Sequence, residues 1–256
     1  MLLAVDSGNT NTVFAVYNGD ECRGVWRCGT SPRRTADEYA VWLIDLMALE
    51  GLDREAVTAS IISSVVPEGN FNLTTLCKRY FKCDPVFIGE DDCDLGIEAL
   101  IDRPDQVGAD RLVNTVAAHG KYEGALIVID FGTATTFDVV DEDGNYCGGV
   151  ICPGINLSLD ALYMAAAQLP RVDIRATTSI IGKATVPAMQ SGIFWGYIGM
   201  IEGLVQRIGQ EFGAEMIVVA TGGLAPLFAE ATEVIDHVYP DMTLRGLVEV
   251  HKRNRR

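Results

Sequence analysis

The sequence contains one segment twice, and this repeat constrains the fold more than any other feature. Residues 2–16 read LLAVDSGNTNTVFAV and residues 126–140 read LIVIDFGTATTFDVV. Each copy reads as an apolar strand ending in an acidic residue, a glycine-containing turn and a second strand, which is the pattern of a β-hairpin. Aligning the copies places Asp6 over Asp130, Gly8 over Gly132, Thr12 over Thr136 and Val16 over Val140.

The two copies also continue alike. After a shift of one residue, the pair Asn18-Gly19 falls over Asp143-Gly144. Such dipeptides favour the tight turns of hairpins, so a third strand is expected after each repeat. The duplicated unit is therefore a hairpin extended by a further strand, and a chain that uses it twice is expected to build two similar sheets.

Helical and strand patterns alternate after each hairpin. Residues 35–50 have apolar residues at helical spacing behind a capping box formed by Thr35 and Glu38, and the β-branched run 59–66 predicts a buried strand. We therefore expect an α/β protein with two lobes, 1–118 and 119–256, and a ligand cleft between them. Further helices are expected over 70–80, 156–168, 188–210 and from 243 onward, with strands over 85–88 and 216–220.

The charge balance excludes some classes of partner. The 256 residues carry 20 Lys and Arg against 35 Asp and Glu, a formal net charge of -15. A field of this sign repels nucleic-acid backbones and anionic membranes, so neither is expected as a partner. The seven cysteines are odd in number and scattered without a C-x-x-C pair, which indicates reduced thiols and no zinc site. We expect a cytoplasmic protein.

The loop of each hairpin has the chemistry of a phosphate site. In Asp6-Ser7-Gly8-Asn9-Thr10-Asn11-Thr12, a strand-end carboxylate is followed by glycine and short polar residues, so backbone N–H groups are available to phosphate oxygens. An acid beside polyphosphate makes sense chiefly with Mg²⁺ between them. One copy alone would read as an ordinary hairpin. The second copy, at 130–136, predicts that two hairpins grip one nucleotide.

Other nucleotide signatures are absent or weak. The tetrapeptide Gly182-Lys183-Ala184-Thr185 resembles the end of a P-loop, but Thr177 stands where the earlier glycine is required. No G-x-G-x-x-G follows a strand, so a dinucleotide fold is unsupported. Gly222 and Gly223 follow a predicted strand, where backbone could pass close to a base or ribose, or could simply turn.

A third acidic motif, Gly108-Ala109-Asp110-Arg111, precedes an apolar helix. Asp110 and Arg111 are expected at the helix N-terminus, where an acid is stabilised and backbone donors are free. A capping Asp with a surface Arg would explain the motif equally well. Its place at the end of the first lobe, just ahead of the second hairpin, favours a position near the cleft.

Taken together and in order, these motifs resemble type III pantothenate kinase. They are D-x-G-N-T, G-A-D-R, D-x-G-T-A-x-T, P-G-I at Pro153-Gly154-Ile155, TVPAMQSG over 185–192, and T-G-G, and they span nearly the whole chain. The resemblance implies a duplicated actin-like, ribonuclease H-like ATPase fold. It also implies phosphorylation of pantothenate by ATP in the first step of coenzyme A synthesis, a homodimer, and a need for Mg²⁺ and a monovalent cation, K⁺ or NH₄⁺.

The resemblance also implies roles for individual residues. It implies that Asp110 is the catalytic base and that Asp130 binds the monovalent cation. From the chemistry of the loop, we further expect Asp6 to organise Mg²⁺ through water. Thr185 contacts the substrate, and Ile101 stands where the family often has a pocket tyrosine, so a hydroxyl is lost there. The ATP-binding set is Asp6, Ser7, Gly8, Asn9, Thr10, Asn11, Thr12, Val13 and Thr133, with Gly222 and Gly223 added from their own sequence context; the substrate set is Gly108, Ala109, Asp110 and Arg111.

A row of glycines bears on assembly. Gly192, Gly196, Gly199 and Gly203 recur at intervals of four, three and four, so they line one face of a predicted helix. This face either packs within its lobe or forms part of a twofold interface. Two functional alternatives also stay open: another small-molecule kinase of the superfamily, or a nucleotide-binding regulatory protein of the same fold.

Overall fold

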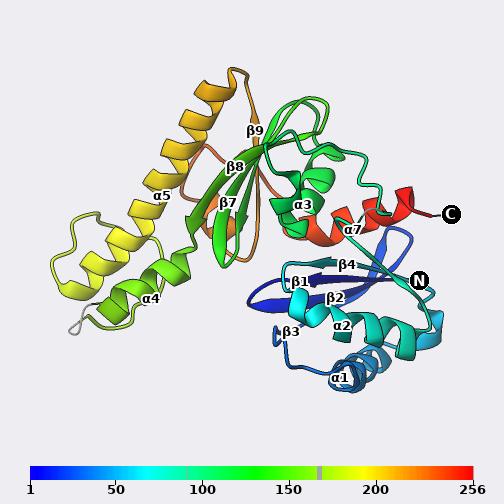
Figure 1. Cartoon of the computed structure of the whole chain (residues 1–256). Coiled ribbons are helices and arrows are strands. Elements are labelled where there is room, and N and C mark those ends of the chain that lie inside the picture. Colours follow the sequence, from blue (N-terminus) through cyan, green and yellow to red (C-terminus); the bar gives the residue numbers. More distant parts are fainter. Residues whose placement is uncertain (91, 166–168, 256) are drawn as a thin grey trace. The chain divides into compact units, whose positions relative to one another are not determined.

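The computed structural model describes residues 1–90, 92–165 and 169–255 (Figure 1). The chain forms two compact units, one of Met1–Gly120 with Asp241–Arg256 and one of Lys121–Pro240. The units differ from the lobes expected from sequence in two respects: the boundary lies after Gly120 instead of after residue 118, and the C-terminal helix belongs with the first unit. The reason for the second is local: that helix lies so close to the helix that follows Gly108 that a Cβ on Gly246 would clash with Val113.

The first unit is built on a five-stranded sheet with the order β3-β2-β1-β4-β5. Strands β1 and β2 form the predicted antiparallel hairpin, and β1 also pairs in parallel with β4, so that it lies at the centre of the sheet. The strands are β1 (Leu2–Ser7), β2 (Asn11–Asn18), β3 (Glu21–Gly29), β4 (Ala59–Ser64) and β5 (Pro85–Phe87).

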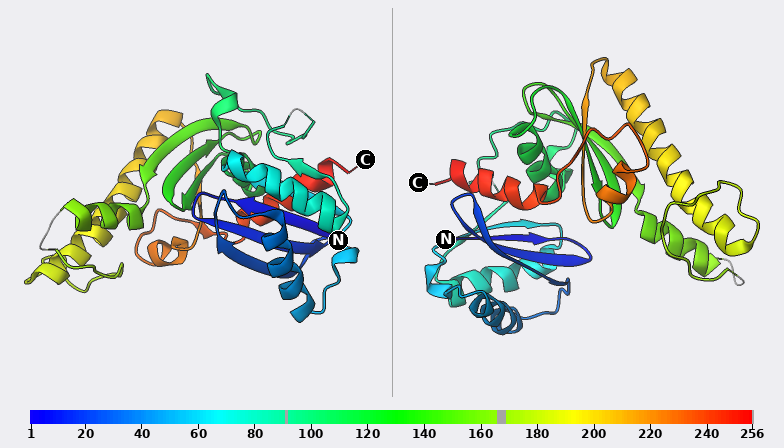
Figure 2. Two further views of the ribbon diagram at one scale, coloured as in Figure 1. Left: turned by 60° about the horizontal axis from the view of Figure 1, so that its bottom comes forward. Right: turned by 180° about the vertical axis from the view of Figure 1, so that it is seen from behind.

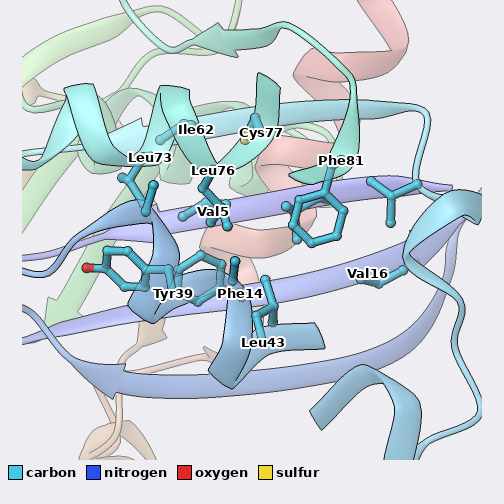
Figure 3. Packing of buried hydrophobic residues seen from close by; sticks show 14 of the residues in the cluster. Val5, Phe14, Val16, Tyr39, Leu43, Ile62, Leu73, Leu76, Cys77 and Phe81 are labelled. Atoms are coloured by element: carbon cyan, nitrogen blue, oxygen red, sulfur yellow. The ribbon is translucent and has the colours of Figure 1, made fainter. Parts of the chain in front are cut away.

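Helices cover both faces of this sheet. On one face, Val5, Phe14 and Ile62 pack against α1 (Ala36–Leu49) and α2 (Pro67–Leu76), as Figure 3 shows at close range. On the other face, side chains of β1, β2 and β4 pack with α3 (Ala109–His119) and α7 (Met242–Arg253). Successive strand residues point to opposite faces, so every second residue of β1 and β4 points toward α3 and α7.

The second unit repeats the plan. Its sheet has the order β10-β9-β6-β7-β8, in which β6 again pairs antiparallel with β7 and parallel with β9. Even the irregularity recurs, because the register shifts between Val16 and Tyr17 in one sheet and between Val139 and Val140 in the other. The strands are β6 (Leu126–Phe131), β7 (Ala134–Val140), β8 (Tyr146–Pro153), β9 (Ile217–Thr221) and β10 (His237–Val238).

The helices of the second unit differ in length from those of the first. They are α4 (Ile155–Ala165), α5 (Thr185–Phe212) and α6 (Ala225–Ala229). Both views in Figure 2 show α4 beside the first turns of α5. The predicted helix over 156–168 is confirmed through 165, and its last three residues lie outside the described part of the chain.

Several local predictions are confirmed. The capping box forms as expected, with the Thr35 hydroxyl accepting from the backbone N–H of Glu38 at 3.3 Å and the Glu38 carboxylate accepting from the N–H of Thr35 at 2.8 Å. All seven cysteines are free. The helix expected over 70–80 is α2 followed by a π-helical turn, Cys77–Phe81, that ends at Lys82 in a left-handed conformation. Among the described residues, no helix has the length and apolar character needed to cross a membrane.

Candidate functional site

The turn between β1 and β2 is short and held by backbone bonds. The Gly8 N–H donates to the Asn11 carbonyl at 3.0 Å. Thr30, at the end of β3, fixes the turn from the side, because its hydroxyl donates to the Gly8 carbonyl at 2.7 Å and its N–H donates to the Thr10 carbonyl at 2.9 Å. Asn9, Thr10 and Asn11 are exposed on this rigid turn. The turn therefore presents backbone and short polar groups to a ligand in one fixed conformation.

Three residues of the predicted ATP-binding set lie inside the fold. Ser7 is 3% exposed, Thr12 is fully buried and Val13 is 9% exposed. The hydroxyls of Ser7 and Thr12 lie 3.4 Å apart, and that of Thr12 lies 2.9 Å from the Thr30 hydroxyl. These hydroxyls tie the two hairpin strands to β3. Only the turn residues Gly8 to Asn11 and the half-buried Asp6 reach the surface of this segment.

Asp6 points to the face of the sheet that α3 covers. It follows Leu2 and Ala4, both in the apolar cluster that includes α3, and it pairs in register with Ser63 of β4. The N-terminus of α3 lies at the same end of the sheet, because a Cβ on Gly108 would be 3.6 Å from Val65, whose N–H donates to the Ser7 carbonyl. The structure thus brings the Asp6 strand end and the start of α3 to one edge of the first unit.

Asp110 is in the first turn of α3, as predicted, with Gly108 as the N-cap residue. Its Oδ1 accepts from the Arg111 N–H at 2.8 Å. Burial raises the pKa of Asp110 above its ordinary value, since a carboxylate removed from water loses solvation; the Arg111 N–H and guanidinium oppose the shift only in part. A half-buried carboxylate with a raised pKa is a stronger base than an exposed one and is a feature of acid–base sites.

The equivalent loop of the second unit is fixed by a different neighbour. Gly132 donates to the Ala134 carbonyl at 3.0 Å, which closes the turn, and Gly154 donates to the Thr133 carbonyl at 3.2 Å. A Cβ on Gly154 would overlap Thr133 and lie 2.8 Å from the Gly132 carbonyl oxygen. Only glycine fits there, which explains the P-G-I motif physically. Thr133 itself is exposed at the tip of the loop.

Asp130 and Gly222 are neighbours in this second unit. Asp130 pairs in register with Thr221 at the end of β9, and a Cβ on Gly222 would lie 2.9 Å from the Asp130 carboxylate. Gly223 is exposed and has open space around it. The carboxylate of Asp130, the exposed Thr133 and the two glycines therefore lie around one edge of the sheet.

The remaining predicted residues lie elsewhere in their units. Thr185 is exposed at the start of α5 and helps to line a hollow of about 490 Å³ whose other walls are mostly apolar side chains of α4 and α5. Ile101 is half-buried in the segment before α3. Asp6 and Asp110 belong to the first unit, whereas Asp130, Thr133, Thr185, Gly222 and Gly223 belong to the second.

No group of three or more metal-ligating side chains occurs among the described residues. The half-buried carboxylate of Asp6 is a donor that suits Mg²⁺, which in nucleotide sites is bound by one or two carboxylates, by water and by the phosphates of the substrate. A structural zinc or calcium site needs several protein ligands. Single carboxylates at strand ends, as at Asp6 and Asp130, suit a cation that arrives with its ligand.

Comparison with known proteins decides the family. The family model for type III pantothenate kinase matches residues 2–207. The chain belongs to the type III pantothenate kinase family. Curated family members include one from Paramagnetospirillum magneticum, 67% identical over 254 residues, 99% of this chain and 98% of the relative. Another, from Rhodospirillum rubrum, is 66% identical over 99% of each chain.

Solved structures confirm the fold of this family member. A candidate 2-dehydro-3-deoxygalactonokinase from Sinorhizobium meliloti superposes with a TM-score of 0.62 over 99% of this chain and 96% of that chain, at 16% sequence identity. At such identity the likeness concerns the fold alone. The predicted duplicated actin-like α/β fold is therefore confirmed, and the predicted membership of the type III pantothenate kinase family is confirmed as well.

Sequence reasoning missed two residues beside the first hairpin of this pantothenate kinase family member. Thr30 holds the first loop, yet it lies outside every motif, and only the pairing of β2 with β3 brings it there. Ser63 lies opposite Asp6 and has a buried hydroxyl with no hydrogen-bond partner in the described part of the chain. A serine within a β-branched run gives no signal of its own, because the parallel register that pairs it with Asp6 is not visible in the sequence.

Proposed function

We propose that this chain transfers the γ-phosphoryl group of ATP to the primary hydroxyl of pantothenate, giving 4'-phosphopantothenate and ADP, the first step of coenzyme A synthesis. One observation carries the proposal: relatives named type III pantothenate kinase are up to 67% identical over 99% of the chain. Asp6, Asp110 and Asp130 all belong to this chain, 99% of which the match covers. The raised pKa of Asp110 adds chemical support.

Asp110 acts as the general base. In the transfer, the pantothenate oxygen forms a bond to the γ-phosphorus while the bond from that phosphorus to the β–γ bridging oxygen breaks, and the hydroxyl proton passes to the Asp110 carboxylate. Such reactions depend mostly on positioning and on neutralising charge. A positioned base adds a factor of roughly 10² to 10⁴. The hydrogen bond from the Arg111 N–H to Oδ1 orients the carboxylate for this role.

Each hairpin loop, taken by itself, is assigned a role in ATP binding. The rigid turn Gly8 to Asn11 offers backbone N–H groups to phosphate oxygens, and the exposed Thr133 adds a hydroxyl. Gly222 and Gly223 supply backbone without side chains for the nucleoside. Asp6 is placed to hold Mg²⁺ through water, and the metal, when bound, neutralises charge on the phosphates. Asp130 holds a monovalent cation, K⁺ or NH₄⁺, through its carboxylate.

Pantothenate binds at the start of α3. The segment Gly108 to Arg111 combines a helix N-terminus, a base and a guanidinium, which suits a substrate that carries both an alcohol and a carboxylate. Thr185 contributes a further hydroxyl contact, and Ile101 gives the pocket an apolar wall where the family often has a tyrosine. The geminal dimethyl group of pantothenate is compatible with that apolar wall.

The exposed glycine face of α5 supports a homodimer. Gly192, Gly196 and Gly199 are exposed, and a Cβ added to any of them would meet nothing within 4 Å. Packing of these three glycines within their own unit, the first alternative from the sequence, is therefore not observed among the described residues, whereas Gly203 is half-buried beside Arg207. Apolar side chains are also exposed in α4 and in the segment before α5, among them Met164, Ile180 and Ile181. We infer that a twofold interface forms on this face of α5.

The free cysteines support a separate proposal, that the protein works in a reducing, cytoplasmic setting.

A substrate panel tests the function. The purified chain is incubated with ATP, Mg²⁺ and K⁺ and, in turn, with pantothenate, N-acetylglucosamine, glucose and glycerol, and products are identified by mass spectrometry. We expect a phosphorylated product with pantothenate only. Phosphorylation of a sugar with no reaction of pantothenate would favour the rival reading as another small-molecule kinase, and ATP binding without any acceptor would favour a regulatory protein.

A further inference from the structure

The hydroxyl of Ser63 is buried and unsatisfied. Ser63 is fully buried in β4, and its Oγ has no hydrogen-bond partner among the described residues. A buried hydroxyl without a partner costs free energy relative to an alanine at the same place. Stability alone therefore does not explain a serine at this position, and a role that appears only in another state of the protein is indicated.

The other serines of β4 show what the sheet provides when a hydroxyl is structural. The Ser60 hydroxyl accepts from the Cys83 thiol at 3.4 Å, and the Ser64 hydroxyl donates to Asn70 at 2.6 Å and accepts from the Val66 N–H. Both point to the face covered by α1 and α2, because they alternate with Ser63 along the strand. Only Ser63 points to the face that α3 covers, and only Ser63 among these three lacks a partner.

The neighbour of Ser63 on that face is Asp6. The two residues are paired in the parallel register of β1 and β4, so their side chains leave the same side of the sheet on strands about 4.8 Å apart. Asp6 already has an interaction in this structure. Donation from Ser63 would require the Asp6 carboxylate to turn toward β4 about its side-chain torsions. The two groups are complementary, since one can donate and the other accepts.

We propose that Ser63 is a positioning residue for Asp6: its hydroxyl donates to the Asp6 carboxylate when the protein binds Mg²⁺ and ATP. The inference rests on the proposed function, in which Asp6 holds Mg²⁺ through water. A hydrogen bond to the carboxylate fixes its orientation and stabilises its ionised form, as donors beside metal-binding carboxylates do. The free energy lost by leaving Ser63 unpaired in the empty state is recovered when the metal and nucleotide are bound.

The test compares Ser63→Ala with the wild type by two readouts. Calorimetry with a non-hydrolysable ATP analogue at a series of Mg²⁺ concentrations gives the metal requirement of binding, and thermal unfolding gives the Tm. We expect the half-saturating Mg²⁺ concentration to rise about tenfold to hundredfold, the usual effect of removing a group that orients a metal-binding carboxylate. We expect the Tm without ligand to be unchanged or higher, because an unsatisfied polar group is removed.

Ser60→Ala is the matched control. It makes the same change on the same strand, removes a satisfied hydroxyl, and points to the opposite face. It is expected to lower the Tm and to leave the Mg²⁺ requirement unchanged. A Ser63→Ala protein that behaves like Ser60→Ala, with a lower Tm and an unchanged metal requirement, would overturn the inference.

Asp6→Asn separates this inference from the proposed function. A raised Mg²⁺ requirement in both Asp6→Asn and Ser63→Ala, with no further rise in the double variant, supports the positioning role. A raised requirement in Asp6→Asn alone overturns the role of Ser63 and leaves that of Asp6 intact. An unchanged requirement in Asp6→Asn overturns the role of Asp6 and, with it, that of Ser63.

Discussion

Gly222 packs against the end of strand β6 so closely that a Cβ on it would lie 2.6 Å from the carbonyl oxygen of Phe131. Its φ of 91° is also one that residues with a side chain rarely adopt. The glycine therefore holds the end of β9 against the strand that carries Asp130. Contacts within the second unit are therefore enough to explain why position 222 is a glycine, without reference to a ligand.

Gly222→Ala is expected to destabilise the protein by about 1–3 kcal/mol, because the backbone must move away from Phe131 and leave its left-handed conformation. Thermal or denaturant unfolding measures the effect. The adjacent Gly223→Ala is the control, since its Cβ would meet nothing within 4 Å. Equal losses from both changes would contradict the steric explanation.

The pKa of Asp110 predicts how stability and activity depend on pH. Because the folded-state pKa lies above the unfolded value, ionisation of this carboxyl opposes folding. The free energy of unfolding begins to fall as the pH rises through the pKa of Asp110 in the unfolded chain. The fall is complete once the pH exceeds the pKa of Asp110 in the folded protein. Asp110→Asn, which keeps an Oδ1 acceptor for the Arg111 N–H, is therefore expected to raise the Tm at pH 7 and to leave it unchanged at pH values below ordinary carboxyl titration.

Over the same pH range, activity is expected to increase as the pH rises, whereas stability decreases. A base must be ionised, so kcat/KM falls as pH decreases through the raised pKa of Asp110, above the range of an ordinary aspartate. A pH–rate profile measures this limb. An Asp110→Asn variant with a lower Tm than the wild type at pH 7, or a rate that does not change until ordinary carboxyl titration, would count against the assignment.

Asp130 is expected to make activity depend on the monovalent cation. The wild type should be active in K⁺ or NH₄⁺ and much less so in Na⁺ or choline at equal ionic strength. Asp130→Asn should reduce the difference among these salts, because the carboxylate that holds the ion is lost. Initial rates in the four salts measure both effects. A wild type that is indifferent to the cation would reject the role given to Asp130.

The glycine face of α5 predicts an effect on assembly. Gly196→Leu should strengthen the helix intrinsically, since glycine is a poor helix former, yet weaken dimerisation by filling the surface where a partner backbone approaches. Sedimentation velocity measures the association. Gly209→Leu, on another side of the same helix and also in open space, is the control. A stable dimer of the Gly196→Leu variant would assign the interface to another surface.

The architecture could be predicted from the sequence because the internal repeat indicates a duplicated hairpin unit. Two copies of strand, acid, turn and strand were enough to predict two hairpins, and the structure adds that both are embedded in sheets of the same order. The position of Asp110 in the first turn of α3 was predicted from the apolar helical pattern of the residues that follow it. The packing of α7 in the first unit was not predicted, because it depends on the close approach of Gly246 to Val113, a contact between residues far apart in the chain.

The predictions for the sites were less complete. The motifs predict roles for Gly8, Asn9 and Asp130, but they could not show that Ser7 and Thr12 point inward, since that depends on which face of the sheet α1 covers. The partners that fix the loops, Thr30 and Gly154, come from other strands. Register and close packing bring them there, and neither can be read from a motif.

The central claim is that this chain phosphorylates pantothenate with Asp110 as the base. It is tested most directly by measuring turnover and ATP-analogue binding on the same preparation of Asp110→Asn, with Asp105→Asn as the control because Asp105 makes only an exposed ion pair with Arg103. We predict that Asp110→Asn binds the analogue like the wild type but loses roughly 10²- to 10⁴-fold in kcat, while Asp105→Asn keeps both. Turnover of pantothenate by Asp110→Asn at the wild-type rate would contradict the account.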